Sequence, residues 1–263
     1  MNRSSITGEK SRTGTQSLQR AAALLRALMS AEDNGASVAE LAALTAIERT
    51  TTHRMLRCLM EEGLASQDPR SRRYTLGPLA YEIGVAAAGR LDLRALCGPV
   101  LRRIADESED TAFLIIRSGD DSVCIDRAEG SYPVRALVVD VGTRRPLGVG
   151  AGSLAILGAL QPAEREDVIL RNAARIGTFD GLTPDKLRQQ MARARTDAHV
   201  ALDVVGVKDV RAVAVPIRTT TGHAIAALSI SAVCSRMTGQ REAALIKRLK
   251  QEAATIQTLL VKR

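Results

Sequence analysis

The sequence predicts an α+β protein that consists of a winged helix-turn-helix and a larger domain built around an antiparallel sheet. Three observations support this fold class. The chain has 263 residues, which is long for one domain and sufficient for two. Residues 17–76 show three helix-like segments followed by a short hairpin, and the rest contains two hairpin-like groups of strands separated by helices. The expected parts are a disordered tail (1–14), a winged helix-turn-helix domain (15–78), a linker helix (79–96) and a second domain (97–263).

The composition is that of a globular protein with a basic charge balance. Hydrophobic residues make up 45% of the chain and aromatic residues only 2%, which argues against a protein that stacks single-stranded bases on aromatic side chains. Lys and Arg outnumber Asp and Glu by 37 to 29, and the net charge of +8 favours a polyanionic partner. No segment is long and apolar enough to span a membrane, so we expect a soluble, cytoplasmic protein.

The cysteines and histidines form no metal-ligand pattern. The four cysteines are far apart, no pair has the C-x-x-C spacing, and the three histidines are dispersed. We therefore expect free thiols in a reducing compartment, no metal site and no cofactor. The cysteines are Cys58, Cys97, Cys124 and Cys234.

The N-terminal segments carry the signals of a helix-turn-helix. The first helix is expected to begin at Ser17, a suitable N-cap, and to end before the Asn-Gly pair at 34–35. A Ser-Val-Ala-Glu capping box at 37–40 begins the second helix. After a turn at 45–47, the third helix is expected over 48–62, where a glycine follows it. Two helices joined by so short a turn predict a helix-turn-helix.

The third helix has one face for packing and one face suited to DNA. The packing face carries Ile47, Thr52, Leu56 and Leu59. The other face carries hydrogen-bond donors and no carboxylate, because Arg can pair with guanine and Thr can bond a base or contact the thymine methyl group. Glu48 precedes this face and either stabilises the helix dipole or accepts a hydrogen bond from cytosine. The residues expected to contact DNA are Arg49, Thr50, Thr51 at the boundary of the two faces, His53, Arg54 and Arg57.

A hairpin is expected directly after the third helix, where a wing belongs. Two short extended runs surround an Asp-Pro turn at 68–71. Basic side chains at its tip suit phosphates or a narrow minor groove, although each arginine alone could equally be a solvated surface residue. The capped helix, short turn, basic helix and basic hairpin together predict binding to double-stranded DNA. The expected wing contacts are Arg70, Arg72 and Arg73.

A glycine-rich loop at 148–152 is the segment of chemical interest in the second domain. Free amides at the start of the helix expected from Ser153 would attract an anion such as a carboxylate, and a tight packing turn is the alternative. The loop lacks G-x-G-x-x-G, because Ser153 stands where the third glycine belongs, and it lacks G-x-S-x-G, because Ala151 and Ala155 flank Ser153. An enzyme that uses this loop therefore remains an alternative without a nucleophile–base pair.

The remaining elements of the second domain follow from periodicity. Strands are expected at 112–117, 122–127, 134–139, 210–217 and 224–231. Helices are expected at 153–160, 163–174, 184–196 and 238–261.

Several segments resemble the IclR family of transcription regulators. The most specific are the Thr-x-His-Arg-hydrophobic-Leu run at 51–56 and the Arg-Tyr-x-Leu-Gly wing exit at 73–77. Further similarity lies at 140–147, 211–216 and 227–231, so the resemblance covers nearly everything after the tail. It implies a GAF-like C-terminal α/β domain whose sheet face, covered by the glycine loop, holds a small-molecule effector. It also implies dimers that often pair into tetramers.

The resemblance also implies a set of effector contacts. Where many members have an acidic residue this chain has Leu202, a common cysteine is replaced by Ala212, and Ser153-Leu154-Ala155 stands where the loop often ends in Gly-Lys-Ala. Each change makes the site less polar, so the expected effector is an organic acid with an apolar or aromatic body. Alternation along 224–231 places the two serines of the set on one strand face. The carried-over positions are Ala151, Gly152, Leu202, Asp203, Ala212, Ser229 and Ser231.

These inferences predict a sequence-specific transcription regulator that is not an enzyme. Effector binding is expected to change the arrangement of a homodimer, and the linker helix would pass that change to the recognition helices. Two-fold symmetry predicts a palindromic operator, and a tetramer is an alternative assembly. The main alternative function is an architectural DNA-binding protein whose second domain only oligomerises, which predicts DNA affinity independent of any ligand.

Overall fold

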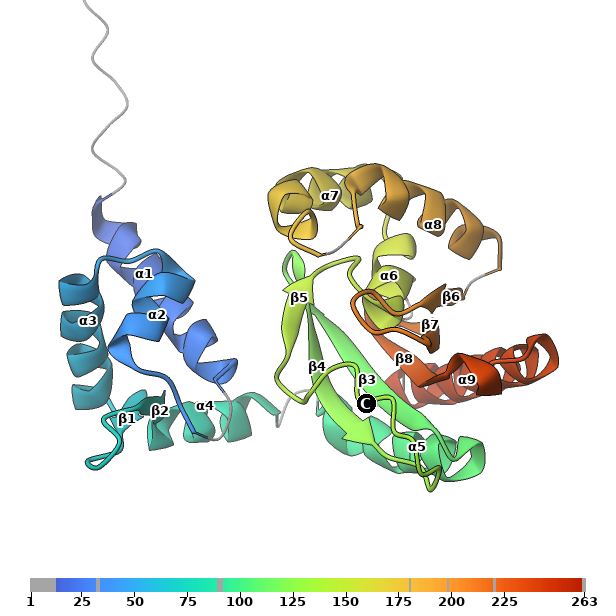
Figure 1. Cartoon of the computed structure of the whole chain (residues 1–263), viewed down its shortest axis with the longest axis horizontal. Coiled ribbons are helices and arrows are strands. Elements are labelled where there is room, and N and C mark those ends of the chain that lie inside the picture. Colours follow the sequence, from blue (N-terminus) through green and yellow to red (C-terminus); the bar gives the residue numbers. More distant parts are fainter. Residues whose placement is uncertain are drawn as a thin grey trace, which may run out of the picture. The chain divides into compact units, whose positions relative to one another are not determined.

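A computed structural model of the chain describes residues 13–31, 34–88, 92–179, 181–197, 199–219 and 221–261. The chain forms two compact units, Met1–Leu91 and Asp92–Arg263 (Figure 1). The tail expected at 1–14 lies outside the described residues, apart from Thr13 and Gly14, which begin the first helix. None of the described helices combines the length and the hydropathy that a membrane span requires.

The first unit contains three packed helices followed by a hairpin and a further helix. Leu24, Leu41 and Leu56 are fully buried where the three helices meet. The two hairpin strands are antiparallel, and Ala36 forms a bridge to Tyr74 beside them. The predicted winged helix-turn-helix is therefore confirmed. The elements are α1 (Thr13–Met29), α2 (Val38–Thr45), α3 (Arg49–Glu61), β1 (Ala65–Gln67), β2 (Tyr74–Leu76) and α4 (Pro78–Ala88).

Local capping explains the boundaries of α2 and α3. The Ser37 amide donates to the Glu40 carboxylate at 2.7 Å, and the Glu40 amide donates to Ser37 Oγ at 3.3 Å, so the capping box is present. Ala46 takes a left-handed conformation (φ 53°) in the turn between the helices, and Gly63 does so after α3 (φ 70°). These short-range signals are the ones that the sequence reveals most directly.

The start and the apolar face of α1 differ from the prediction. The helix begins at Thr13, so Ser17 lies inside it and is not its cap. Leu18, expected on the packing face, is 72% exposed, whereas Leu24 and Leu28 are buried. Several spacings of small and apolar residues fit a helical repeat in this segment, and contact with α2 and α3 selects which face is buried.

The helix expected over 79–96 is two helices in the structure. α4 ends at Ala88, and α5 (Leu93–Ser108) begins after Asp92. The Asp92 carboxylate accepts a hydrogen bond from the Ala95 amide at 2.8 Å, as an N-cap does. Continuous apolar spacing therefore concealed a helix start that the aspartate marks.

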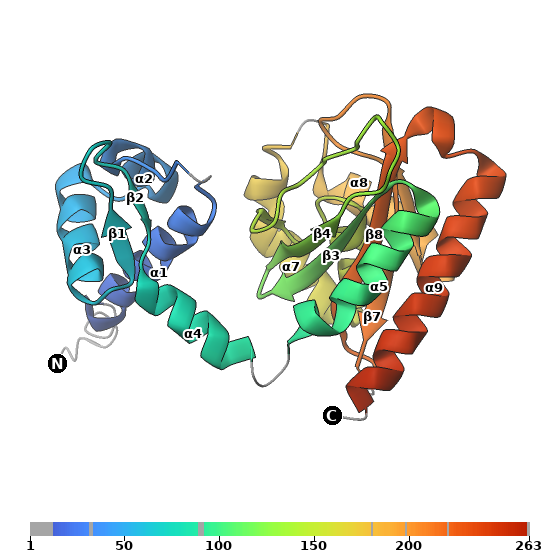
Figure 2. The same ribbon diagram turned by 90° about the horizontal axis from the view of Figure 1, so that it is seen from below.

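The described residues of the second unit form a six-stranded antiparallel sheet in the order β5-β4-β3-β8-β7-β6. This sheet confirms the predicted fold class. Helices cover both faces, with α5 and α9 on one and α6 on the other (Figures 1 and 2). The strands are β3 (Thr111–Ser118), β4 (Asp121–Ala128), β5 (Arg144–Pro146), β6 (Val200–Asp203), β7 (Val210–Arg218) and β8 (Ala224–Val233). The further helices are α6 (Ala151–Gly158), α7 (Pro162–Ile176), α8 (Pro184–Asp197) and α9 (Gly239–Val261), with a 3₁₀ turn, η1, at Cys234–Arg236.

Alternation along the central strands divides the second unit into two cores. On β8, Leu228 and Ile230 pack toward α5 and α9, whereas Ala227 packs toward α6. The two serines of β8 share the parity of Ala227 and are also buried. The face that turns toward α6 is thus the face on which the predicted effector serines lie.

The segment expected as a strand at 134–139 is irregular, and this part of the prediction was wrong. The outer edge of β4 is occupied by the residues that lead into β5. The Cys124 amide donates to the Thr143 carbonyl at 3.0 Å, and the Gly142 amide donates to the Cys124 carbonyl at 2.8 Å. With that edge already paired, the β-branched residues at 134–139 have no strand beside which to form a ladder.

Candidate DNA-binding surface and effector pocket

The two faces of α3 differ in burial as predicted. The packing residues Ile47, Thr52, Leu56 and Leu59 are buried. Thr51 is half-buried at the boundary, and the remaining predicted contacts are exposed: Arg49, Thr50, His53, Arg54 and Arg57. The fold therefore presents a polar, basic helix face to solvent.

Glu48 caps this helix. Its carboxylate accepts hydrogen bonds from the amides of Thr50 and Thr51, each at 2.9 Å, and from the Thr50 hydroxyl. These bonds, that of the Thr50 hydroxyl first, lower the pKa of Glu48 to about 2. Of the two roles considered for this carboxylate, the structure shows the one at the helix start.

The arginines of α3 differ in their partners. Within the described part of the chain, no carboxylate lies within 4 Å of the guanidinium of Arg49 or Arg54. Arg57 approaches Glu61 at 3.4 Å, but the two side chains are 77% and 63% exposed. An ion pair so exposed is weak, so all three cations remain available to an external anion.

The tip of the hairpin is held by Asp68. Its carboxylate accepts from the amides of Arg70 (3.0 Å) and Ser71 (2.6 Å) and from the Ser71 hydroxyl (2.8 Å). Bonding to Ser71, first of all to its amide, lowers the pKa of Asp68. Arg70 and Arg72 project from this tip into solvent, and Arg72 takes a positive φ of 59°.

Arg73 has a different role from its two neighbours in the wing. Its Nε donates to the Asn34 carbonyl at 3.0 Å, and its Nη2 donates to the Gly35 carbonyl and to the Glu40 carboxylate, each at 2.9 Å. The side chain is half-buried and connects the wing to the loop before α2. Sequence alone did not reveal this, because the partners lie far away along the chain.

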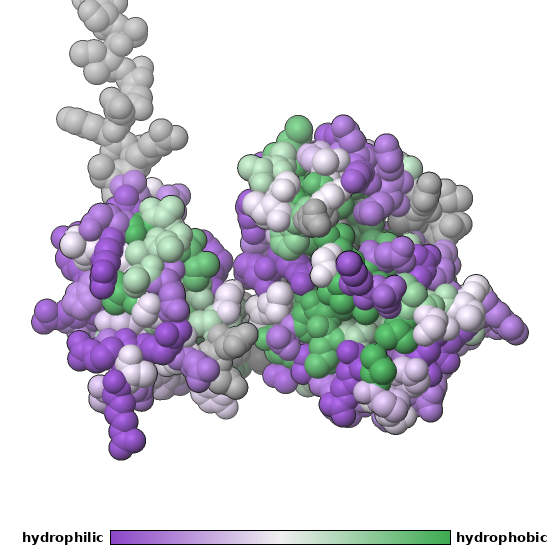
Figure 3. Space-filling view, in the orientation of Figure 1, coloured by the Kyte–Doolittle hydropathy of each residue, from purple (hydrophilic) through white to green (hydrophobic). Residues whose placement is uncertain are grey.

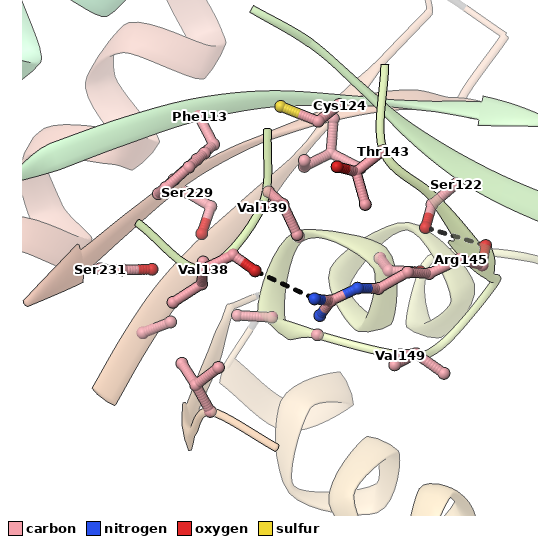
Figure 4. A pocket seen from close by; sticks show the side chains of 17 residues that line it. Phe113, Ser122, Cys124, Val138, Val139, Thr143, Arg145, Val149, Ser229 and Ser231 are labelled. Carbon is pink, nitrogen blue, oxygen red and sulfur yellow. Dashed lines mark hydrogen bonds between the residues drawn. The ribbon is translucent and has the colours of Figure 1, made fainter. Parts of the chain in front are cut away.

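A cavity of about 50 Å³ lies on the α6 face of the sheet in the second unit (Figure 4). Its apolar lining comes from Phe113 and Ile115 on β3, from Val138 and Val139 before β5, and from Val149. Residues of the glycine loop and of the first turn of α6 complete the wall. The cavity is therefore enclosed mainly by aliphatic side chains and by backbone.

Five of the seven carried-over positions line this cavity. They are Ala151 and Gly152 at the start of α6, Ala212 on β7, and Ser229 and Ser231 on β8. Leu202 and Asp203 do not line it. Leu202 packs into the core opposite Ala212, and Asp203, one residue further, points to the other sheet face, where it pairs with Arg211 at 2.9 Å. Val204 continues the alternation and takes the place in the lining.

The glycine loop combines tight packing with the cavity wall. A Cβ on Gly152 would lie 2.8 Å from Ile115 Cγ1, and Gly148 takes a φ of 109°. Ser153 Oγ accepts from the Gly148 amide at 2.8 Å, so this hydroxyl fixes the loop. α6 begins at Ala151 and not at Ser153. Packing therefore explains the small residues, while the first amides of α6, which lack helical partners, belong to the wall.

Two family descriptions match the chain. Residues 17–69 match the IclR helix-turn-helix domain, and residues 85–258 match the C-terminal domain of the bacterial transcriptional regulator IclR. The chain belongs to the IclR family. The HTH-type transcriptional regulator KipR of Bacillus subtilis is 30% identical over 222 residues, which cover 84% of this chain and 88% of KipR. The HTH-type transcriptional repressor AllR of Klebsiella pneumoniae is 28% identical over 250 residues, 94% of this chain and 90% of AllR.

Solved structures of the IclR family share the fold. An IclR transcriptional regulator from Alicyclobacillus acidocaldarius is 26% identical, with a TM-score of 0.76 over 93% of this chain and 98% of that one. An IclR homologue from Microbacterium hydrocarbonoxydans, solved in complex with 4-hydroxybenzoate, has a TM-score of 0.73 at 22% identity, over 94% of this chain and all of that one. The predicted family and fold class are thus confirmed, and the chain is a DNA-binding transcription regulator and not an enzyme.

Two polar residues of this IclR-family pocket stand out because one has no hydrogen-bond partner and the other has a single one. Ser231 Oγ is buried and has no hydrogen-bond partner. Arg145, which sequence analysis did not select, lines the cavity and donates from Nη2 to the Val138 carbonyl at 2.9 Å (Figure 4). Burial lowers the pKa of Arg145. Arg144 and Arg145 are consecutive on β5, so their side chains point to opposite faces of the sheet, and this alternation could have identified Arg145 from the sequence.

Two of the thiols of this regulator, Cys97 and Cys124, are buried and unreactive. All four cysteines are free. Burial raises the pKa of Cys97 and of Cys124 to about 12, so neither is a thiolate near neutral pH. Across the described ranges, no three side chains of the metal-binding types lie close enough together to hold an ion.

Proposed function

We propose that this regulator binds a palindromic operator as a homodimer and changes its affinity when an organic acid with an apolar or aromatic body occupies the α6-face cavity. The observation that carries this proposal is the cavity itself, because five positions expected to contact the effector converge there around an unpaired hydroxyl. A cavity with few, convergent polar groups in an apolar wall is typical of a small-molecule site.

The proposed DNA contacts combine the exposed face of α3 with the wing tip. The α3 residues would read base edges in the major groove, and the wing arginines would bind phosphates or the minor groove. Arg73 is left out, because its guanidinium is occupied by the Gly35 carbonyl and Glu40. The proposed set is Arg49, Thr50, Thr51, His53, Arg54, Arg57, Arg70 and Arg72.

The exposed apolar residues of α4 support a dimer. Tyr81, Ile83 and Val85 are 77%, 53% and 55% exposed, although the helix is rich in alanine and aliphatic residues. A helix that is apolar on its solvent side favours contact with another protein surface, here a second copy of the chain. Two-fold symmetry then gives half-sites about one helical turn of DNA apart. A tetramer built from two such dimers is the alternative.

The cavity wall supports an apolar or aromatic effector. The lining is aliphatic and aromatic around a few polar atoms, and the Microbacterium homologue holds the aromatic acid 4-hydroxybenzoate. Benzene occupies protein cavities of roughly 150 Å³, whereas this cavity has about 50 Å³. An aromatic effector would therefore displace part of the wall, and the irregular segment that carries Val138 and Val139 is the part without ladder hydrogen bonds.

Such a displacement would couple ligand and DNA. If the two dimer arrangements differ in the position of that wall, the effector shifts the equilibrium between them by the ratio of its affinities for the two arrangements. By the same linkage, DNA binding changes the affinity for the effector by the same factor. A regulator of this kind acts where the chromosome is, in the cytoplasm of a bacterium.

Selection from a genomic fragment library at about 100–150 mM salt, where counterion release already weakens non-specific contacts, tests the DNA half of the proposal. We expect an enriched palindrome that Arg54→Ala retains more weakly than the wild type does. Ser229→Val tests the ligand half: ligand-dependent release from the palindrome should disappear, whereas Ser235→Val, an exposed serine on η1, should respond like the wild type. Two results would favour the architectural alternative. One is uniform retention of DNA fragments without a shared motif, and the other is DNA release that is the same with and without every organic acid tested.

A further inference from the structure

The two arginines of β5 differ in their surroundings. Arg144 Nη1 lies 3.0 Å from the Asp121 carboxylate, and its Nη2 donates to Ser118 Oγ at 3.2 Å. Arg145, the next residue, points to the opposite face, as neighbours on a strand do, and reaches the cavity. Arg144 is thus neutralised within the protein, whereas the charge of Arg145 is directed toward the ligand site.

The guanidinium of Arg145 is incompletely satisfied. A guanidinium carries five N–H donors, and the structure gives this one a single acceptor, the Val138 carbonyl. Its remaining neighbour is the ring of Phe179, whose centroid lies 5.9 Å away. In the part of the chain that the structure describes, no carboxylate lies within 4 Å of it.

A cation in such a place is costly unless an anion joins it. Burial lowers the pKa of Arg145, but an arginine starts so high that it stays protonated at neutral pH. Removing a charge from water without a counter-ion is unfavourable, and most half-buried arginines of this unit have a carboxylate partner. The missing partner is therefore expected to come from outside the chain.

The opposite wall supplies a second unmet polar group. Figure 4 shows Ser229 and Ser231 on β8 at one side of the cavity and the Arg145 guanidinium at another. The buried Ser231 hydroxyl has no partner, and apolar side chains make up most of the remaining cavity lining. A ligand that satisfies both groups needs an anionic end, an apolar middle and a polar, uncharged end.

We propose that Arg145 is the residue that recognises the effector's charge, by pairing with a single carboxylate, while Ser231 bonds a neutral polar group at the ligand's other end. The ligand class is a monocarboxylic acid with an apolar or aromatic body and a distal hydroxyl or similar group. A second carboxylate would meet no cation among the described lining residues. This inference rests on the proposed function, since it names the residue of the same pocket that binds the carboxylate of the effector.

The test compares matched ligands on the full chain by isothermal titration calorimetry. The probes are 4-hydroxybenzoate, its neutral isostere 4-hydroxybenzamide, and the dicarboxylate terephthalate. We expect the wild type to bind the monocarboxylate at least roughly tenfold more tightly than either of the others, because charge-assisted bidentate pairing is strong and the amide lacks the charge. Arg145→Gln should bind acid and amide equally, and Arg145→Lys should keep part of the preference, because it retains charge but not the planar fork.

A matched control is Arg218→Gln. Arg218 is also half-buried and bonded to carbonyls, those of Ala159 (3.1 Å) and Gly222 (3.0 Å), but it does not line this cavity. Its substitution should leave the acid preference unchanged. Thermal unfolding of each variant shows whether the variant is still folded.

The outcomes separate this inference from the function on which it rests. Equal binding of acid and amide by the wild type, or an acid preference that survives in a folded Arg145→Gln, overturns the role of Arg145 and leaves the pocket as a ligand site. Absence of binding by all three probes overturns the proposed effector class and this inference together. If Arg145→Gln does not fold, the wild-type preference and the Arg145→Lys variant still decide.

Discussion

The two units of this regulator use arginine in opposite ways. In the first unit, Arg49, Arg54, Arg70 and Arg72 are exposed, and no described carboxylate lies within ion-pair distance of them. In the second unit, most of the described arginines are paired with carboxylates, as Arg236 is with Asp110 at 2.9 Å. The same side chain therefore serves as an available cation in one unit and as a cross-link in the other.

This contrast shows why net charge does not locate a nucleic-acid surface. The chain carries a charge of +8, but its distribution between the units says little, because neighbouring carboxylates cancel much of the basic charge of the second unit. What distinguishes a DNA-binding face is the absence of internal partners, which sequence counts do not reveal. Arg73, which bonds to Glu40 within the first unit, and Arg145, which has no described carboxylate partner in the second, are exceptions to these tendencies.

The largest effect is expected from removing a shared carboxylate in the second unit. Asp110 is buried and accepts from Arg236 at 2.9 Å and from Arg241 at 2.7 Å. Asp110→Ala leaves Arg241 without a carboxylate and Arg236 with only the more exposed Glu109 at 3.2 Å, and it should lower the free energy of unfolding by about 3–5 kcal/mol. Urea unfolding measures this, with Asp106→Ala as the control, since that residue is exposed and should change stability by less than about 0.5 kcal/mol. Similar losses in both variants would contradict the cross-linking role.

The next largest effect concerns binding and not stability. Arg54→Ala removes an exposed, unpaired cation from α3 and should weaken operator binding by about 1–3 kcal/mol with no change in unfolding. The control is Arg102→Ala on α5, an exposed arginine that also lacks a carboxylate partner among described residues but lies in the second unit. Fluorescence anisotropy with operator and unrelated duplexes measures both. If the two substitutions weaken binding equally, overall charge and not the α3 face determines affinity.

Substitution of Arg72 and Arg73, neighbours in the wing, should distinguish an arginine that is available to DNA from one that stabilises the fold. Arg72→Gly removes a cation from a left-handed position that glycine adopts without strain, so stability should be kept while the slope of log affinity against log salt falls by about 1. Arg73→Ala removes the bonds to Gly35 and Glu40 and should cost about 1.5–3 kcal/mol of stability with the slope unchanged. Thermal unfolding and salt titrations of DNA binding provide the readouts. If instead Arg73→Ala lowers the salt slope and leaves stability unchanged, the Arg73 side chain leaves its position in the free protein when DNA binds.

The parts predicted from sequence are those fixed by local patterns. Helices α2 and α3, the wing and the central strands follow from capping residues, periodicity and turn residues within a few positions of each other. The wrong strand at 134–139 has the right residues for a strand, but the edge it needed is taken by the segment before β5. Tertiary competition of this kind leaves no local trace.

The candidate sites show the same division. Ser229 and Ser231 were correctly placed on one face because alternation is a local rule, and the same rule excludes Asp203 from the face of Leu202. The roles of Arg73 and Arg145 depend on groups remote in sequence or absent from the chain, such as Gly35, 38 residues from Arg73. A residue type in a pattern predicts an available charge, and only the fold tells whether that charge is already used.

The smallest effect is expected from Glu48, the carboxylate that caps α3 beside the proposed DNA contacts. Hydrogen bonds, first from the Thr50 hydroxyl and then from the amides of Thr50 and Thr51, lower the pKa of Glu48 from its usual 4.5 to about 2. The charged form is favoured in the folded state, so its stabilising contribution is complete above about pH 4.5 and is lost as the pH falls toward 2. Glu48→Gln should therefore lower the unfolding midpoint slightly at pH 6 and hardly at all at pH 2.5.

Thermal unfolding of the wild type and Glu48→Gln across that pH range tests this cap. The control is Glu61→Gln at the other end of α3, where the carboxylate is exposed and makes only the weak pair with Arg57. A difference between wild type and Glu48→Gln that persists at pH 2.5 would mean that the side chain acts through its shape and not its charge. A difference that disappears would show that one exposed carboxylate is kept ionised to hold the start of α3, while the arginines that follow stay free for DNA.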